Sequence, residues 1–340
     1  MSRLRIGLLG PGMIVKKAVA PAIVSSRMAQ LEVIGSRSIA RARAAAEQFG
    51  GRAVEGYEAV IQDPRVDVVY IALPNALHVE WIVKAARAGK HVICEKPAVL
   101  AWRDALRVIE ACERSGVRFL EAYMFRFHPQ HARITELIRG GILGEVFHFE
   151  AAFGFPPLSP DNFRYDVALG GGALRDAGGY PIAAARMLFE EEPEAVCATA
   201  HCLTQGGVDV QGALQLEFPS GRTAHAVYGF TNFYRNTYAL WGSRGRVVTE
   251  RAFSIPPDIA PSIVLTTGDG ATPLPSGAED QFRLMIDAFC EAVSSPESGH
   301  AFETEFLAQS RVSAAAWQSA QTQRRVRIKQ APRPARACMP

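Results

Sequence analysis

Hydrophobic residues in the first 123 positions fall into short, nearly continuous runs. The runs cover residues 4–9, 31–35, 66–73, 92–94 and 117–122, and amphipathic, helix-type patterns cover residues 41–49, 81–88 and 105–115. Continuous apolar runs are typical of strands that are buried on both faces, and their alternation with helices indicates a parallel sheet. We therefore expect a doubly wound α/β domain over residues 1–123.

The pattern changes after Tyr123. Apolar runs at residues 144–155, 196–204, 210–218, 223–233, 238–241 and 246–250 follow one another, and turn signals rather than helices separate them. Consecutive strands without helices between them predict a mostly antiparallel sheet. A glycine-rich segment at residues 170–180 is the exception, since it leads into an apolar helix. We place this α+β domain at residues 124–325 and expect a flexible basic tail at residues 326–340.

Composition excludes several classes of protein. With 340 residues, 48% hydrophobic and 21% charged, the chain has the composition of an ordinary globular protein, and a net charge of +3 does not favour a nucleic-acid partner. No apolar run approaches the length that crosses a bilayer. The six cysteines have neither metal-site nor disulfide spacing, and the N-terminus runs almost at once into a strand. We expect a cytoplasmic protein with free thiols, no bound metal and no membrane partner.

The segment after the first strand contains the elements of a dinucleotide site. Gly10-Pro11-Gly12-Met13-Ile14 joins a strand to a helix, as such a site requires. Gly10 permits a tight turn, and Gly12 lets a pyrophosphate approach the amides of the helix N-terminus. Val15 occupies the third small position of the motif and should push the helix slightly away from the strand. We expect Gly10, Gly12, Met13 and Ile14 to contact the cofactor.

The end of the second strand bears on the choice of cofactor. An acidic residue there accepts a hydrogen bond from the 2′-hydroxyl of NAD, but this chain has Ser36 and Arg37 instead. Arginine beside small hydroxyl residues suits the 2′-phosphate of NADP. The alternative is that Arg37 is a surface residue ahead of the next helix. We interpret the pair as favouring NADP(H).

Further candidate residues follow two later strands of the same sheet. Leu73-Pro74-Asn75 with His78, and Glu95-Lys96-Pro97, stand at the edge where open α/β sheets bind ligands. Lys96 is one of six lysines among 37 basic residues, and a lysine can polarise a carbonyl or handle a proton. The alternatives are a solvated charge for Lys96 and a helix-start residue for His78. We assign all these residues except Pro97 to the cofactor site.

Taken together, these motifs resemble those of a known family. They are Gly10-Pro11-Gly12, Pro74-Asn75 with His78, Gly89-Lys90-His91 with Glu95-Lys96-Pro97, and Gly170-Gly171-Gly172 with Asp176 and Gly178. In order and spacing they are similar to those of the Gfo/Idh/MocA oxidoreductases, over nearly the whole chain. The resemblance implies a Rossmann domain followed by an open-faced sheet domain that often mediates oligomer contacts. An exposed sheet face predicts self-association, and we expect a homodimer or a homotetramer.

One position narrows the resemblance. Many family members carry histidine four residues after the aspartate of the glycine-rich motif, whereas this chain has Tyr180. The tyrosine form resembles a branch that includes glucose-fructose oxidoreductase and nucleotide-sugar 3-ketoreductases. Residues 79–81, 127–131, 153–165, 251–257 and 280–282 lean towards the ketoreductases. The alternatives are an NADP-dependent aldose 1-dehydrogenase or dihydrodiol dehydrogenase of the same branch and, from another class, a non-catalytic dinucleotide-binding sensor.

The ketoreductase resemblance implies NADPH-dependent reduction of a 3-keto group on a dTDP-linked deoxyhexose, with roles for five residues. Lys96 would hydrogen-bond the carbonyl oxygen, and Tyr180, its pKa lowered by the lysine, would donate the proton. Asp176 lies one helical turn before Tyr180 and would orient Lys96 or the substrate. Arg164 and Tyr165 would contact the sugar or the diphosphate. The alternatives are packing for Tyr180, a helix N-terminal charge for Asp176, and a surface loop for the last pair.

Overall fold

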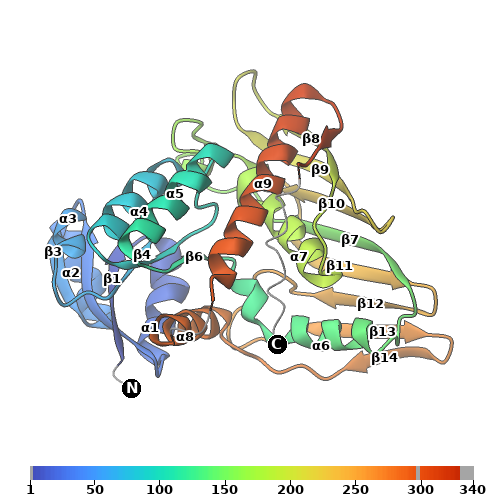
Figure 1. The fold of residues 1–340 in the computed structure, drawn as a ribbon, viewed down its shortest axis with the longest axis horizontal. Coiled ribbons are helices and arrows are strands. Elements are labelled where there is room, and N and C mark those ends of the chain that lie inside the picture. The colour runs from blue at the N-terminus through green and yellow to red at the C-terminus, as the bar shows by residue number, and fades with distance from the viewer. Residues whose placement is uncertain (1–2, 296–298, 330–340) are drawn as a thin grey trace, which may run out of the picture.

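The computed structural model describes residues 3–295 and 299–329. Its N-terminal half is a six-stranded parallel sheet in the order β3-β2-β1-β4-β5-β6 (Figure 1). The strands are β1 Leu4–Leu9, β2 Ala29–Ser36, β3 Arg52–Glu55, β4 Val68–Ile71, β5 His91–Cys94 and β6 Phe119–Glu121. The predicted doubly wound parallel sheet is confirmed, with β3 as an additional edge strand.

Successive residues of the central strands face two different cores. Leu8 and Tyr70 belong to one core, whereas Leu9 and Ile71 belong to the other. The helices of this half are α1 Ala20–Ser25, α2 Ile39–Phe49, α3 Glu58–Ile61, α4 His78–Arg87 and α5 Trp102–Ser115. Residues of α1 and α2 complete the first core, and residues of α3, α4 and α5 complete the second. Burial on both faces explains why these strands are continuous apolar runs in the sequence.

The second half contains a nine-stranded sheet in the order β14-β13-β12-β11-β7-β10-β9-β8-β15. The strands are β7 Val146–Gly154, β8 Ala195–Cys202, β9 Asp209–Glu217, β10 Thr223–Gly229, β11 Arg235–Gly242, β12 Gly245–Glu250, β13 Ser262–Thr267, β14 Gly270–Leu274 and β15 Val326–Arg327. β7 pairs in parallel with β10, and the other neighbouring strands of this sheet pair antiparallel. The mostly antiparallel prediction is confirmed.

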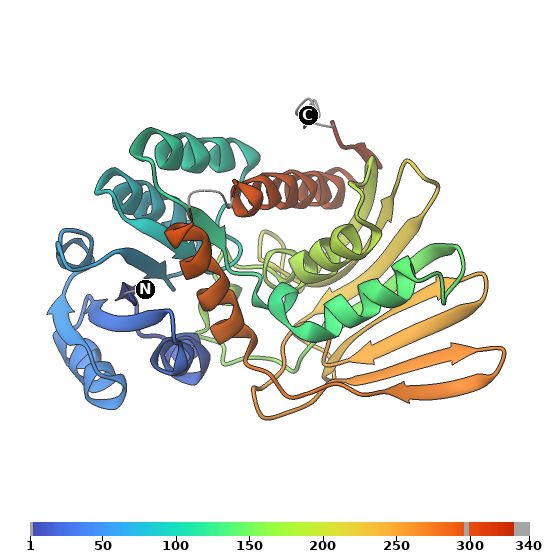
Figure 2. The same cartoon turned by 60° about the horizontal axis from the view of Figure 1, so that its bottom comes forward.

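Helices cover one face of this second sheet and leave the other face open (Figure 2). The covering helices are α6 Pro129–Arg139, α7 Gly179–Phe189 and α9 Ala301–Thr322. Phe149 and Tyr238 are buried on the covered side. Val227 and Trp241, on β10 and β11, are 51% and 56% exposed. The sheet therefore has the open face that the family resemblance implied.

Short irregular helices stand at the sheet edge of the first domain and at the glycine-rich motif. They are the π-helical turns η1 Val15–Val19 and η5 Leu174–Gly178, and the 3-10 segments η2 Asn75–Leu77, η3 Met124–Phe127 and η4 Phe163–Tyr165. The two π turns directly precede α1 and α7. π turns are rare and are frequently found at functional sites.

The C-terminal helices return to the first domain. Helix α8, Gln281–Ser294, begins after Asp280, whose carboxylate accepts hydrogen bonds from the first-turn amides, and it contacts α1 and β2. Helix α9 contacts α5 and β6, where Arg118 donates to Glu303 over 2.9 Å. We assigned both helices to the second domain, at residues 124–325, but they also pack on the Rossmann domain.

The predicted tail begins with ordered chain. Residues Val326–Arg327 form β15, which pairs with β8 at Val196 and Ala195. The structure therefore corrects the start of the predicted tail at residue 326. The rest of that prediction, from residue 330 onwards, lies outside the described residues.

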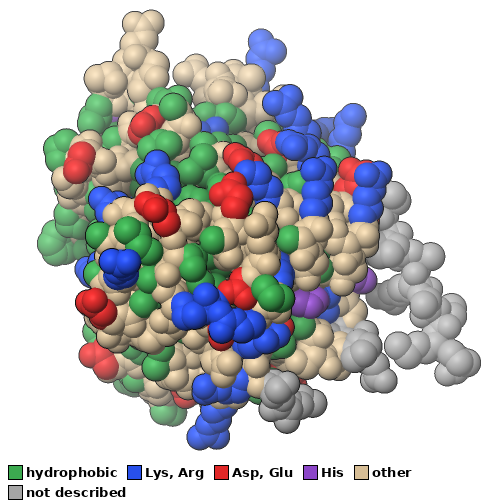
Figure 3. All heavy atoms as spheres, turned by 90° about the vertical axis from the view of Figure 1, so that its left-hand side faces the viewer, with side chains coloured by type: hydrophobic (Ala, Val, Ile, Leu, Met, Phe, Trp, Pro, Cys, Tyr) green, Lys and Arg blue, Asp and Glu red, His purple; other side chains and the backbone are tan. Residues whose placement is uncertain are grey.

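Charges are mixed on the outer face of the Rossmann domain. Lys and Arg side chains alternate with Asp and Glu side chains across the view in Figure 3. Elsewhere in this domain, Arg65 pairs with Glu32 at 3.3 Å and Lys84 pairs with Glu80 at 2.7 Å. This face is thus not a continuous basic surface of the kind that attracts a phosphate backbone.

Candidate active site

Two glycines shape the turn after β1. Gly10 has φ +86°, and a Cβ there would lie 2.9 Å from the backbone oxygen of Ala72, so a side chain does not fit. The tight turn predicted at Gly10 is confirmed. A Cβ on Gly12 would have Gly10 O as its nearest neighbour, 4.0 Å away. The backbone at Gly12 therefore faces open space in which a phosphate group has room.

The residues beside this turn are accessible. Met13 and Ile14 are 62% and 40% exposed, which is unusual for apolar residues at a helix start. At the end of β2, the hydroxyl of Ser36 accepts a hydrogen bond from the amide of Ser38 over 3.2 Å. Arg37 is exposed and has no ion-pair partner in the part of the chain that the structure describes. Its guanidinium is free to bind an anion.

Asn75 and His78 brace the walls of the cleft. Asn75 Nδ2 donates to Gly170 O over 2.9 Å, which joins the Rossmann domain to the glycine-rich motif. His78 is fully buried, with its ring nitrogens 2.8 Å from Pro97 O and 2.8 Å from Leu73 O. Burial lowers the pKa of its imidazole, although the two carbonyl contacts act in the opposite direction. His78 thus links the backbone at Leu73 to the backbone at Pro97, two segments that border the predicted cofactor site.

Lys96, Asp176 and Arg164 meet in one ion cluster. Lys96 Nζ lies 2.8 Å from Asp176 O and 3.0 Å from Asp176 Oδ1. Arg164 Nε lies 2.7 Å from Asp176 Oδ2. The Lys96 and Asp176 side chains are 9% and 8% exposed, so the pair is shielded from water. Asp176 stands within the π turn η5, and both its backbone carbonyl and its carboxylate contact the lysine.

This cluster keeps Asp176 ionised. Burial by itself would raise the pKa of the carboxyl. The positive charges of Lys96 and Arg164 and their hydrogen bonds outweigh burial and hold that pKa well below its usual value. A fixed negative charge therefore anchors the lysine ammonium at the end of β5.

The ring of Tyr180 is next to the lysine. Lys96 Nζ lies 4.7 Å from the ring centroid, and the tyrosine hydroxyl lies 3.6 Å from Met124 Sδ. We expected the lysine to lower the pKa of the Tyr180 hydroxyl, and this expectation is wrong. Burial, reinforced by the charges of Glu95 and Asp176, raises that pKa well above 10, although the charge of Arg164 acts in the opposite direction. Tyr180 is therefore a protonated hydroxyl at neutral pH.

Glu95 is also held in place. Tyr70 donates its hydroxyl hydrogen to Glu95 Oε1 over 2.8 Å. Burial raises the pKa of the Glu95 carboxyl, while the neighbouring Lys96 charge lowers it. The carboxyl of Glu95 is thus fixed at the same strand end as the lysine.

The loop before the glycine-rich motif uses its two candidate residues differently. Arg164 is directed to Asp176, as described above. The hydroxyl of Tyr165 accepts a hydrogen bond from the amide of Leu158 over 3.0 Å, and its ring packs on Phe230 at 5.3 Å between centroids. Tyr165 therefore orders the loop itself.

Sequence comparison places this geometry in a family. Residues 4–123 match the model described as "Oxidoreductase family, NAD-binding Rossmann fold", and residues 131–248 match the "GFO/IDH/MocA C-terminal domain". The chain belongs to the GFO/IDH/MocA oxidoreductase family. The predicted family and its two-domain fold are confirmed.

Individual relatives cover almost the whole chain. A dTDP-3,4-didehydro-2,6-dideoxy-alpha-D-glucose 3-reductase from Saccharopolyspora spinosa is 37% identical over 85% of this chain and 87% of its own length. A D-xylose 1-dehydrogenase (NADP(+)) from Haloferax volcanii is 35% identical over 93% and 97%. The crystal structure of a 3-ketoreductase from Actinomadura kijaniata with NADP and TDP-benzene has TM-score 0.90 and 35% identity, covering 94% of this chain and 98% of that one.

The residues of this GFO/IDH/MocA chain fit the dinucleotide that its family domain binds. Gly10 closes the turn, Gly12 leaves its backbone open, and Arg37 offers a free cation at the end of β2. For metal ions the described residues offer no group of three or more His, Cys, Asp or Glu side chains that could act as ligands. Residues 3–295 and 299–329 also contain no helix that is long and apolar enough to cross a membrane.

Two functional neighbours were missed in the sequence. Asp209, at the start of β9, accepts a hydrogen bond from the amide of Leu174 over 2.7 Å and so caps the glycine-rich motif. Tyr70 holds Glu95. A hydroxyl inside the apolar run of β4 was a usable signal for Tyr70. Asp209 gave no signal, because nothing in the sequence links it to a turn 35 residues earlier.

Proposed function

We propose that this chain is an NADPH-dependent 3-ketoreductase that reduces the keto group of a nucleotide-linked 3-keto-deoxyhexose, as in deoxysugar biosynthesis. The observation that carries the proposal is the anchored Lys96 ammonium, which lies beside the Tyr180 ring at the cofactor edge of the sheet. The relatives from Saccharopolyspora spinosa and Actinomadura kijaniata support the sugar-nucleotide substrate through their own described activities.

The chain's residues have complementary roles in this reduction. Bound NADPH supplies the hydride. Lys96 donates a hydrogen bond to the ketone oxygen as negative charge develops there. Tyr180 gives that oxygen its proton, which makes the product alcohol, and a hydroxyl with a raised pKa is in the protonated form that this step requires. Asp176 holds Lys96 in place, and Arg164 neutralises the second oxygen of that carboxylate.

A related enzyme supports the choice of lysine and tyrosine. In structures of the Actinomadura kijaniata ketoreductase, a lysine is replaced by Ala or Glu and a tyrosine is replaced by Phe. Those two residues stand as far apart in sequence as Lys96 and Tyr180 do. Similar spacing within the same fold is what a shared catalytic pair would give.

NADP preference rests on Ser36 and Arg37. The free guanidinium of Arg37 suits a 2′-phosphate, and neither residue supplies the carboxylate that would bind an unmodified ribose. The Actinomadura kijaniata structures contain NADP, which supports this assignment.

The first experiment is to titrate NADPH and NADH into the purified protein, with and without dTDP. We expect tight NADPH binding and dTDP binding alongside it, and preference for NADH would contradict the role of Arg37. The second candidate, an aldose dehydrogenase, is favoured by the similarity to the D-xylose enzyme. Turnover of free pentoses with NADP, without dTDP binding, would support that candidate instead.

Substitutions then test the chemistry. Lys96→Ala and Tyr180→Phe should each lower kcat by about 10²-fold or more, because each removes a group that acts on the ketone oxygen. Binding of NADPH should change little in Tyr180→Phe. Substitution of Arg114, an exposed residue on α5, serves as the control. Wild-type turnover in both active-site variants would contradict the assigned roles.

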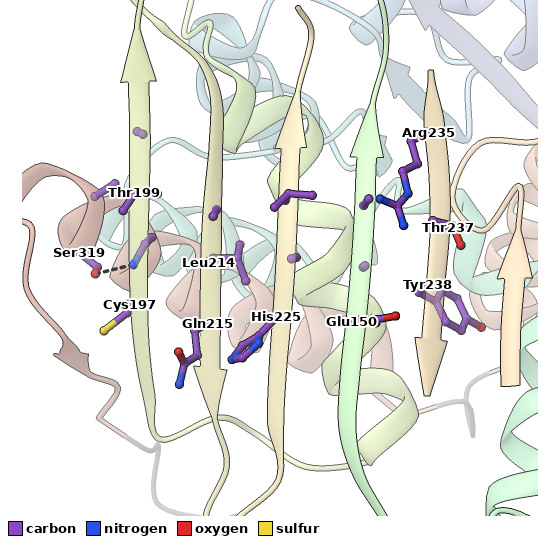
Figure 4. A pocket seen from close by; sticks show the side chains of 18 of the residues that line it. Glu150, Cys197, Thr199, Leu214, Gln215, His225, Arg235, Thr237, Tyr238 and Ser319 are labelled. Atoms are coloured by element: carbon purple, nitrogen blue, oxygen red, sulfur yellow. Dashed lines mark hydrogen bonds between the residues drawn. The ribbon is translucent and has the colours of Figure 1, made fainter. Parts of the chain in front are cut away.

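We further infer that the protein self-associates through the open face of the second sheet. Figure 4 shows Glu150, His225 and Gln215 on adjacent strands of this face, where they help to line a depression of about 800 Å³. Exposed apolar residues there, including Val227 and Trp241, favour contact with a second copy.

We also infer that the protein is located in the cytoplasm. Cys94, Cys112 and Cys290 are buried free thiols, which are typical of a reducing compartment.

A further inference from the structure

A small cavity lies behind the two segments that carry Lys96 and Tyr180. It has a volume of about 40 Å³, and its lining includes Pro97, Gly179 and Ser310. Pro97 directly follows Lys96, and Gly179 directly precedes Tyr180. A buried water requires roughly 10–15 Å³ of such space and polar partners. The cavity is therefore large enough for water, and its wall touches both catalytic segments.

Two polar atoms on the cavity lining lack a protein partner. Glu121 and Ser310 are 8% and 6% exposed. Among the described residues, Glu121 Oε2 and Ser310 Oγ are buried without a hydrogen bond. Buried polar groups in native proteins are nearly always satisfied, by ordered water if not by protein. A water molecule in the cavity would give both atoms a hydrogen-bond partner.

The other oxygen of Glu121 controls the lysine segment. Glu121 Oε1 accepts a hydrogen bond from the amide of Ala98 over 2.8 Å. Ala98 is fully buried and lies two residues after Lys96. A carboxylate at the end of β6 thus fixes the backbone that carries the ammonium.

The other catalytic segment is held from the same side. Gln309, on α9, donates through Nε2 to Gly179 O over 3.0 Å. Its Oε1 accepts from Arg186 over 2.9 Å, so the amide orientation is fixed. The cavity therefore lies between one brace for the lysine segment and one for the tyrosine segment.

Glu121 also changes charge near neutral pH. Burial raises the pKa of its carboxyl to about 7, against the Ala98 hydrogen bond. The charge of Glu305 on α9 raises that pKa further, whereas Lys96 and Arg186 lower it. The hydroxyl of Tyr123 and the thiol of Cys94 also interact with the Glu121 charge.

We propose that Glu121 is a positioning residue for Lys96, acting through the Ala98 amide and with water in the cavity completing its hydrogen bonds. The carboxylate accepts from Ala98 more strongly than the neutral acid does, because hydrogen bonds to ionised groups are stronger. Turnover should therefore decline as Glu121 takes up its proton. This turnover measurement rests on the proposed function, because it requires the protein to reduce a ketone.

The test compares Glu121→Gln and Glu121→Ala with Glu113→Gln, an exposed control on α5. We expect kcat of wild type and control to fall as pH decreases through about 7, while Glu121→Gln lacks this limb. Glu121→Ala should lose about 10- to 100-fold in kcat with a smaller change in KM, as a misplaced catalytic group does. The Gln variant should restore much of that loss, since its amide oxygen still accepts from Ala98.

A second readout needs no substrate. Hydrogen–deuterium exchange of the Ala98 amide, measured in a peptide covering residues 96–100, should be faster in Glu121→Ala than in wild type. If the wild-type protein reduces no nucleotide sugar, the proposed function fails while this measurement still tests Glu121. An unchanged pH limb in Glu121→Gln, or unchanged Ala98 exchange in Glu121→Ala, would overturn the inference.

Discussion

Asp176 shows how one side chain can combine structural and catalytic duties. Its carboxylate contacts Lys96 on one oxygen and Arg164 on the other, and the Lys96 and Asp176 side chains are largely shielded from water. Removing one partner from a buried ion cluster leaves the remaining charges without compensation. The same residue that places the catalytic ammonium should therefore also contribute strongly to folding stability.

Asp176→Asn should lower the free energy of unfolding by about 3 kcal/mol at pH 7 and reduce kcat as well. Urea titration and steady-state kinetics measure the two effects. Asp166→Asn is the control, because that exposed carboxylate, in the same loop, accepts hydrogen bonds from the backbone amides of Ala168 and Leu169.

The sign of the pH dependence follows from the lowered pKa of Asp176. Its stabilisation is fully present above the pKa of the unfolded state, near 4, and is lost as pH falls through the lower folded-state pKa. The difference between wild type and Asp176→Asn should thus be constant at neutral pH and shrink below about pH 4. Equal stability of the two proteins at pH 7 would contradict the ion cluster.

At the scale of elements, the glycine-rich motif depends on one contact between distant segments. Gly172 has φ +121°, and a Cβ there would overlap Asp209 Oδ1. The other oxygen of Asp209 accepts from the Leu174 amide at the start of η5, the turn that carries Asp176. The shape of the motif and its cap are therefore coupled.

Gly172→Ala should cost about 3 kcal/mol of stability, because backbone strain and displacement of Asp209 add together. It should also lower kcat by moving η5. Gly206→Ala separates the two causes, since Gly206 has φ +75° but no atom within 4 Å of an added Cβ. Thermal unfolding of both variants should show the larger loss for Gly172→Ala, and equal losses would argue against the contact with Asp209.

Elements with a simple apolar pattern could be predicted from the sequence. The central strands of both sheets were predictable, because the burial of their residues follows a regular pattern along each strand. Helix α9 could not, because Glu303, Gln309 and Ser319 are polar residues buried along it and interrupt the pattern. At the site, motif spacing indicated Lys96, Asp176 and Tyr180, but the direction of the Tyr180 pKa required knowledge of its burial.

For the whole molecule, the open sheet face sets the expected assembly. Val227 lies on that face and is 51% exposed, whereas Leu106, on α5 of the Rossmann domain, is 50% exposed. If the face is a contact between copies, Val227→Asp should weaken association and Leu106→Asp should not. Sedimentation equilibrium over a range of concentrations measures this difference. A monomeric wild-type protein would contradict the proposed assembly.

Buried and half-buried histidines should make the whole molecule sensitive to acid. The pKa is lowered, chiefly by burial, in His78, His91, His128, His131 and His148. For His131, whose Nδ1 shares a hydrogen bond with the Tyr238 hydroxyl, the pKa is lowered to about 3. The unfolded state takes up a proton near pH 6.5 while the folded state does not, so stability present above pH 6.5 is lost as pH falls towards 3.

His131 should contribute a slope of about 1.4 kcal/mol per pH unit in that window. Glu121 titrates in the opposite sense, because its raised pKa makes the folded state bind the proton first. The slope of unfolding free energy against pH for the wild-type protein alone is therefore less informative than the difference in slope between a variant and the wild type. His131→Asn should reduce the slope between pH 6.5 and 4.5 by about one proton relative to wild type. Urea titrations at several pH values measure it, and an identical slope in His131→Asn and wild type would show that His131 is protonated in the folded protein.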